Sequence, residues 1–258
     1  MKRKRLRTVL VVSALAAGTL FGPSAQGTTA DTKHYPDLRT LKPSDLSITR
    51  QCTLILLGSC TRLLRFSNTV WNGGNGRLEL RPQNNSVLGK TTAYQRIWSH
   101  DAAGKWYLVE EVPVGEFVFH ASHNHWHFEG FANYSLVNEN ADGSIGNNVR
   151  RSSQKTTFCV IDTDKVNANL EHSGSQTYTS CGQNDITGLT VGWGDKYAYN
   201  LSGQSIDITN LPDGRYWLVS SADFQDRIHE TNNSNNWAAV KIKISGTTVS
   251  ELETKFPS

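Results

Sequence analysis

The sequence predicts an all-β protein, a β-sandwich-like single domain or distorted barrel with long irregular loops and little helix. Many short segments rich in Val, Ile, Thr and aromatic residues are separated by Gly, Asn and Asp, as in strands joined by turns. No segment keeps a helical period with capping residues at both ends. About 230 residues follow an N-terminal leader, which is enough for one large β domain with its own core.

Residues 1–30 are typical of a secretory signal peptide. Five basic residues and no acid occur in the first seven positions, and a short apolar run follows from Thr8 to Phe21. Small residues predict cleavage near 27–30, so that 31–258 form the mature domain. The apolar run is too short to span a bilayer, and no later stretch is longer, so we expect a secreted protein without a membrane span. Removing the leader lowers the net charge of +3 to about -2, which gives no reason to expect nucleic-acid binding.

The elements follow in order after the leader. Residues 31–47 contain two prolines and no clear period, and we expect an extended arm laid over the domain. The main irregular insertion is 164–185. Strands are predicted at 63–71, 77–81, 91–98, 106–112, 117–126, 132–137, 157–161, 216–220 and 239–244.

Four cysteines remain after the leader, and in an exported protein they indicate disulfides. Three pairings are possible. We favour Cys52 with Cys60 and Cys159 with Cys181, because each of these closes a short loop. Four cysteines around zinc would need closely spaced Cys pairs, which the sequence lacks.

Half of the eight histidines fall between 120 and 127. His123, His125 and His127 are spaced by two, so on a strand all three leave from one face and form a candidate site for copper or zinc. The outer Cα atoms of a straight strand would lie roughly 13 Å apart, so we expect the segment to bend and to leave one coordination position open. His120 is predicted to lie on the opposite face unless Ala121 and Ser122 form a bulge. It is also the candidate fourth ligand if the metal is purely structural.

Residues 120–136, which read HASHNHWHFEGFANYSL, resemble the copper-binding segment of the lysyl oxidase family. The likeness covers roughly 63–244, and further segments are similar to the family in the same order: 63–66, 155–163, 194–197, 206–209 and 230–233. This resemblance implies copper on His123, His125 and His127. It also implies a lysine tyrosylquinone, a cofactor made by joining Lys155 to Tyr197, with Tyr199 as the competing tyrosine.

The family's activity would make the protein a protein-lysine 6-oxidase-like copper amine oxidase. It would convert primary amines, either peptidyl lysine or small amines, to aldehydes with dioxygen, and release ammonia and hydrogen peroxide. Lys155 must react as a free amine, yet the ordinary pKa of lysine is about 10.4, so burial or a nearby metal must lower it. Asp195 lies two residues before Tyr197 and is our first candidate for the catalytic base, with His120 second.

Two other functions fit the three histidines. A non-catalytic secreted domain that binds copper or zinc would keep the metal ligands without any need for Lys155 and Tyr197 to meet. A zinc hydrolase would use the open coordination position for an activated water and would form no quinone.

Overall fold

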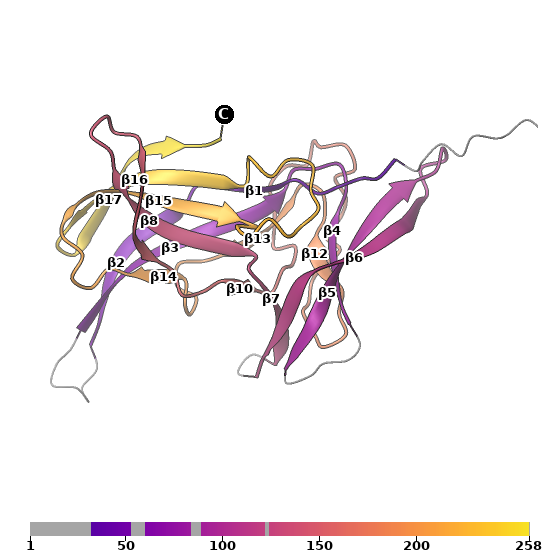
Figure 1. Cartoon of the computed structure of the whole chain (residues 1–258), viewed down its shortest axis with the longest axis horizontal. Coiled ribbons are helices and arrows are strands. Elements are labelled where there is room, and N and C mark those ends of the chain that lie inside the picture. The colour runs from indigo at the N-terminus through magenta and orange to yellow at the C-terminus, as the bar shows by residue number, and fades with distance from the viewer. Residues whose placement is uncertain (1–31, 53–59, 84–88, 122–123, 258) are drawn as a thin grey trace, which may run out of the picture. The chain divides into compact units, whose positions relative to one another are not determined.

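Strands make up the regular structure of this chain. A computed structural model describes residues 32–52, 60–83, 89–121 and 124–257, and these contain seventeen strands and no helix (Figure 1). The strands are β1 (Leu38–Thr40), β2 (Ser44–Cys52), β3 (Cys60–Asn72), β4 (Leu78–Pro82), β5 (Lys90–His100), β6 (Trp106–His120), β7 (His125–Glu129), β8 (Ala132–Glu139), β9 (Ile145–Ser152), β10 (Thr157–Phe158), β11 (Asp164–Lys165), β12 (Thr187–Leu189), β13 (Trp193–Tyr197), β14 (Ser205–Asp207), β15 (Gly214–Ala222), β16 (Trp237–Ser245) and β17 (Thr248–Lys255). The predicted all-β single domain is confirmed.

The strands form three antiparallel sheets. The β3 sheet has the order β1-β3-β13-β11, with β2 and β14 also paired to the long strand β3. The β6 sheet has the order β10-β7-β6-β5-β4-β12, and the β16 sheet has the order β17-β16-β15-β8-β9. Because β3 pairs with four other strands, it fixes the position of β13, which carries Asp195 and Tyr197.

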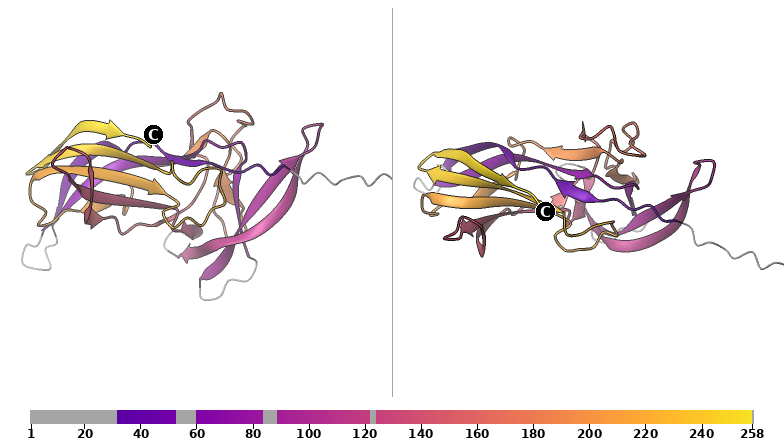
Figure 2. Two further views of the ribbon diagram at one scale, coloured as in Figure 1. Left: turned by 45° about the horizontal axis from the view of Figure 1, so that its top comes forward. Right: turned by 90° about the horizontal axis from the view of Figure 1, so that it is seen from above.

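The β3 sheet and the β16 sheet face each other as the two layers of a sandwich (Figures 1 and 2). Inward-facing residues alternate along the strands, and Phe66 of β3 meets Tyr134 of β8 edge to face with ring centroids 4.9 Å apart. Asn68 also donates a hydrogen bond of 3.1 Å across the layers to Ser220 Oγ. The same core includes Phe117 and Phe128 of the β6 sheet, so all three sheets contribute to one apolar interior.

The N-terminal arm is part of this core, which corrects the prediction that it is laid over the domain. Residues 38–40 form β1 and pair with β3, and Leu38 is fully buried. The backbone N–H of Leu38 donates to Glu230 Oε2 at 2.7 Å. The arm gave no periodic signal because its paired residues are the three of β1 and the irregular start of β2, where the register with β3 shifts.

Most of the predicted strands are present, but the predicted continuous strand 117–126 is not. The predicted strand 117–126 is divided: β6 ends at His120, and β7 begins at His125. Asn124 has a positive φ of 56°, a conformation that asparagine tolerates better than most residues, and its N–H donates to the carbonyl of His120 at 2.8 Å. The chain therefore reverses direction in the middle of the histidine-rich segment.

Both predicted disulfides are present, joining Cys52 to Cys60 and Cys159 to Cys181. The second one lies at the base of the irregular insertion 164–185. Trp126 of β7 donates its backbone N–H to the carbonyl of Cys181 at 2.9 Å, so this disulfide holds the insertion against the strand that carries two of the histidines.

A buried carboxylate organises the rest of the insertion. Asp162 accepts hydrogen bonds from the backbone N–H groups of Thr177 and Thr190 at 2.9 and 2.8 Å, and from the Thr190 hydroxyl at 2.6 Å. Only β11 within the insertion is a strand. The hydrogen bonds to Asp162 therefore take the place of the backbone hydrogen bonds that paired strands would provide.

Residues 1–31 lie outside the described part of the chain, so the cleavage site stays a prediction. Within the described residues, no helix has the length and apolar character needed to cross a membrane.

Candidate metal and lysine–tyrosine site

The β6–β7 hairpin brings three histidines onto one face. His120 pairs directly with His125, and His127 lies two residues farther along β7. Directly opposed residues of an antiparallel pair point to the same face, and so do residues two apart on one strand. His120 therefore shares a face with His125 and His127, because β6 and β7 run antiparallel.

The imidazoles of this hairpin are in close contact. The Nε2 atoms of His125 and His127 are 2.9 Å apart, and the ring centroids of His120 and His127 are 4.1 Å apart in a stacked arrangement. His123, the third predicted metal ligand, lies outside the described residues. Of the residues whose positions are described, no set of three or more His, Cys, Asp or Glu side chains is arranged as a complete metal-binding group.

Thr157 contacts two of these histidines, and the sequence analysis did not single it out. Its Oγ1 lies 3.3 Å from Nδ1 of His127 and 3.3 Å from Nε2 of His120. The position follows from register, because Thr157 of β10 pairs with Glu129 of β7. A contact to Nδ1 leaves Nε2 as the nitrogen of His127 that can bind a metal. The sequence offered no signal for this contact beyond a hydroxyl residue two positions after Lys155.

Lys155 and Tyr197 are neighbours in the fold. The Lys155 Nζ lies 4.2 Å from the centroid of the Tyr197 ring and 5.2 Å from that of Phe158. Phe158 also packs edge to face against Tyr197, with centroids 4.8 Å apart. Tyr199, the competing tyrosine, has a side chain that is 45% exposed. Tyr197 is thus the tyrosine that the fold brings to Lys155.

Burial controls the titration of this pair. It lowers the pKa of Lys155, which is the direction that a nucleophilic amine requires, while the nearby Asp195 carboxylate opposes this shift. Burial also raises the pKa of Tyr197 well above the ordinary value, and Asp195 adds to that effect. The Tyr197 hydroxyl donates to the carbonyl of Cys159 at 3.0 Å.

Asp195 is a buried carboxyl group beside both members of the pair. It is 3% exposed, and its Oδ2 has no hydrogen-bond partner among the described residues. Burial raises its pKa well above the ordinary value, and the positive charge of Lys155 lowers it in part. Asp195 and Tyr197 are two apart on β13 and share a face, as predicted.

The close approach of β13 to β3 depends on Gly194. A Cβ at this position would lie 2.7 Å from Thr69 Cγ2 and 2.9 Å from Trp71 Cβ. Since Gly194 pairs with Trp71 and Tyr197 pairs with Asn68, this approach sets how deeply the tyrosine ring enters the core.

These features define an all-β domain in which a histidine-rich hairpin is linked through β10 to a buried lysine–tyrosine pair. The lysyl oxidase family model matches residues 95–253, and the chain belongs to the lysyl oxidase family.

Relatives of known sequence agree with this membership. The chain is 30% identical over 176 residues to lysyl oxidase homolog 2 of Gallus gallus, covering 68% of this chain and 17% of that protein. It is 28% identical over 186 residues to lysyl oxidase homolog 3B of Danio rerio, covering 72% and 18%. It is 27% identical over 186 residues to lysyl oxidase homolog 4 of Homo sapiens, covering 72% and 19%. The chain therefore matches less than a fifth of the length of these relatives.

Proposed function

We propose that this protein is a secreted copper-dependent amine oxidase that makes its own quinone cofactor from Lys155 and Tyr197. It would oxidise a primary amine with dioxygen and water to an aldehyde, ammonia and hydrogen peroxide. The observation that carries the proposal is the Lys155 Nζ lying 4.2 Å from the centroid of the Tyr197 ring. Two side chains that must become covalently joined are already in contact, although they are far apart in the sequence.

The histidines of the hairpin are suitable ligands for copper. Two nitrogens bound to one ion at about 2.0–2.1 Å lie roughly 2.8–3.4 Å apart, and the Nε2 atoms of His125 and His127 are 2.9 Å apart. Imidazole is a favoured copper ligand. We assign His123, His125 and His127 as the ligands. Bound copper would supply, with dioxygen, the oxidation of the tyrosine ring, and the joined quinone would act as an electron sink for amine oxidation.

The protein's own residues prepare the two reactants. Burial favours the neutral amine of Lys155, and only that form has the lone pair needed to attack the oxidised ring. Packing of Phe158 against Tyr197 fixes the ring orientation, so the amine faces the ring. Asp195, whose carboxylate charge acts on Lys155, would accept the proton that Lys155 loses.

Asp195 is also our candidate for the base that acts on the substrate. A base must remove a proton from the carbon next to the substrate nitrogen, and a carboxylate with a raised pKa is better matched to that task at neutral pH. The substrate class is a primary amine, either peptidyl lysine or a small amine.

Peptide mapping of copper-loaded, aerobically matured protein tests the proposal. We expect one cross-linked species that contains the Lys155 and Tyr197 peptides, together with amine-dependent release of hydrogen peroxide. K155R and Y197F should lose both signals, because each removes one partner of the bond. Y199F is the matched control and should retain both.

The alternative functions make different predictions in the same experiment. A non-catalytic metal-binding domain and a zinc hydrolase would both leave the Lys155 and Tyr197 peptides separate and unmodified. Separate peptides after full copper loading in air would therefore contradict the oxidase proposal.

A further inference from the structure

A second group of histidines lies outside the candidate site. The ring centroids of His34 and His100 are 4.7 Å apart, and His172 lies 5.4 Å from each of them. Trp106 contacts all three, with centroids 5.0 to 5.1 Å away. Together with the run at 120–127 and the exposed His229, these three account for all eight histidines of the chain.

Three segments that are far apart in the sequence meet at this cluster. His34 precedes β1 and bridges to Trp98 of β5 through its backbone, and His100 ends β5 at the turn of the β5–β6 hairpin. His172 belongs to the insertion 164–185. A group that bound all three side chains would tie the arm, the hairpin and the insertion together.

Hydrogen bonds to the backbone prepare two of these rings as metal ligands. Nδ1 of His172 lies 2.9 Å from the carbonyl of Asn75, and Nδ1 of His100 lies 3.1 Å from the carbonyl of Asp101. A carbonyl accepts only from a protonated nitrogen, so each contact places the proton on Nδ1 and leaves a lone pair on Nε2. This is the arrangement in which a neutral histidine binds a metal through Nε2.

The third ring has a buried nitrogen that needs a partner. His34 is 8% exposed, and in the described part of the chain its Nδ1 has no hydrogen-bond partner. Burial, reinforced by His100 and His172, lowers the pKa of His34 and favours its neutral form. A carboxylate is also close, since Glu171 Oε1 lies 3.7 Å from Nε2 of His172.

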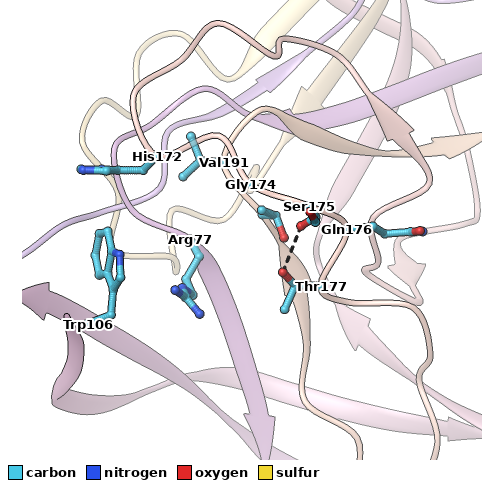
Figure 3. A pocket seen from close by; sticks show the side chains of 9 residues that line it. Arg77, Trp106, His172, Gly174, Ser175, Gln176, Thr177 and Val191 are labelled. Atoms are coloured by element: carbon cyan, nitrogen blue, oxygen red, sulfur yellow. Dashed lines mark hydrogen bonds between the residues drawn. The ribbon is translucent and has the colours of Figure 1, made fainter. Parts of the chain in front are cut away.

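The cluster is reached from a cleft. A cavity of about 310 Å³ is lined by Arg77, Trp106 and His172 among other residues, and Figure 3 shows the latter two side chains at one side of it. The Arg77 guanidinium lies over the Trp106 ring, 5.5 Å from the ring centroid. The cleft gives an ion and its water a route to His172.

We propose that His34, His100 and His172 bind a second divalent transition-metal ion, Zn²⁺, with a structural role. Imidazoles that share one ion at about 2.0–2.1 Å have ring centroids roughly 5 Å apart, as these rings do. Among the described residues, no group of three or more such side chains is arranged to hold a metal ion as it stands, so binding requires side-chain rotations that turn the nitrogens inward. Glu171 or water completes the coordination.

Zinc titration of the full chain, freed of metal and followed by calorimetry at pH 7.5, tests this site. The background is H123Q/H125Q/H127Q, which removes the proposed copper ligands. We expect this protein to bind one Zn²⁺ per chain. Adding H172Q should weaken binding by at least about tenfold, since a ligand is lost, whereas adding H229Q, the matched control, should leave it unchanged.

The readout does not depend on the oxidase proposal, because the background cannot hold copper on the hairpin. No zinc binding by the background, or equal binding by the H172Q and H229Q derivatives, would overturn the second site. If the background fails to fold, the same comparison is made in wild type. One Zn²⁺ equivalent should then bind at least about tenfold more weakly to H172Q than to wild type or to H229Q, and equal affinities for every equivalent would reject the site.

Discussion

Thr157 illustrates how a single hydroxyl can position a proposed metal ligand. It lies 3.3 Å from both His127 and His120, between the histidine hairpin and the lysine–tyrosine pair. The sequence indicated the histidines by their number and spacing, and it indicated Lys155 and Tyr197 only through the resemblance to the lysyl oxidase family. It could not single out Thr157, because the role of a hydroxyl depends on its neighbours in space.

T157V should weaken copper binding by about 10- to 100-fold, the usual effect of losing a hydrogen bond to a metal-bound histidine. Valine keeps the shape of threonine but has no hydroxyl to hydrogen-bond with Nδ1 of His127. Competition with a chelator of known affinity measures the effect. T157S keeps the hydroxyl and should bind copper within about threefold of wild type. Equal affinity in T157V would show that the hydroxyl does not orient the ring.

D195N should lower kcat for amine oxidation by about 10²- to 10⁴-fold, because the amide cannot accept the substrate proton. In wild type, kcat should rise with pH as the raised pKa of Asp195 is passed, and this limb should be missing in D195N. Steady-state peroxide release over a range of pH provides the measurement. D164N removes another negative charge near Asp195 without removing the base, and it should retain most of the activity.

At the scale of elements, the β6–β7 hairpin was only partly predictable. Spacing by two correctly placed His125 and His127 on one face of a strand. The reversal at Asn124 was missed, because the residues around it are as compatible with an extended strand as with a turn. A bend was expected within the strand that carries His123, His125 and His127. The chain instead reverses before His125, and His120 therefore lies on the face of His125 and His127.

β1 depends on a buried carboxyl group, and this makes the stability of the domain depend on pH. Glu230 accepts from the N–H of Leu38 and from the Asn236 side chain, and burial raises its pKa to about 8. Between the ordinary pKa of about 4.3 and this value, the folded state binds more protons than the unfolded state. The free energy of unfolding should therefore fall as pH rises through this range.

E230Q should remove part of this decrease, because glutamine stays neutral throughout. Urea unfolding at pH 5.5 and 8.5 would measure the difference between the two pH values for each protein. E116Q removes a carboxylate that is half exposed and should show the same decrease as wild type. A decrease in E230Q as large as that in wild type would mean that another group is responsible.

At the scale of the whole molecule, composition and turn residues predicted the all-β domain, and short loops predicted both disulfides. The partners of β3 could not be predicted. It pairs with β1, β2, β13 and β14, of which β13 and β14 are more than 120 residues away. Such pairings depend on packing of the complete core, which no local period records.

L38A should lower the free energy of unfolding by about 2–5 kcal/mol, since Leu38 is fully buried in the shared core and alanine leaves a cavity. L41A, three residues later and 39% exposed, should cost less than about 1 kcal/mol. Urea denaturation followed by tryptophan fluorescence compares the two. Similar small losses would indicate that the arm is loosely attached.

Gly194 connects the sandwich to the chemistry proposed for it. A Cβ on Gly194 would lie 2.7 Å from Thr69 Cγ2 and 2.9 Å from Trp71 Cβ, so the pairing of β13 with β3 at this point favours a residue without a side chain. A methyl group at Gly194 would collide with Thr69 and Trp71. It should therefore shift β13 and move the Tyr197 phenol relative to the Lys155 amine. If Lys155 and Tyr197 become joined as proposed, Gly194 would influence that reaction without taking part in the bond.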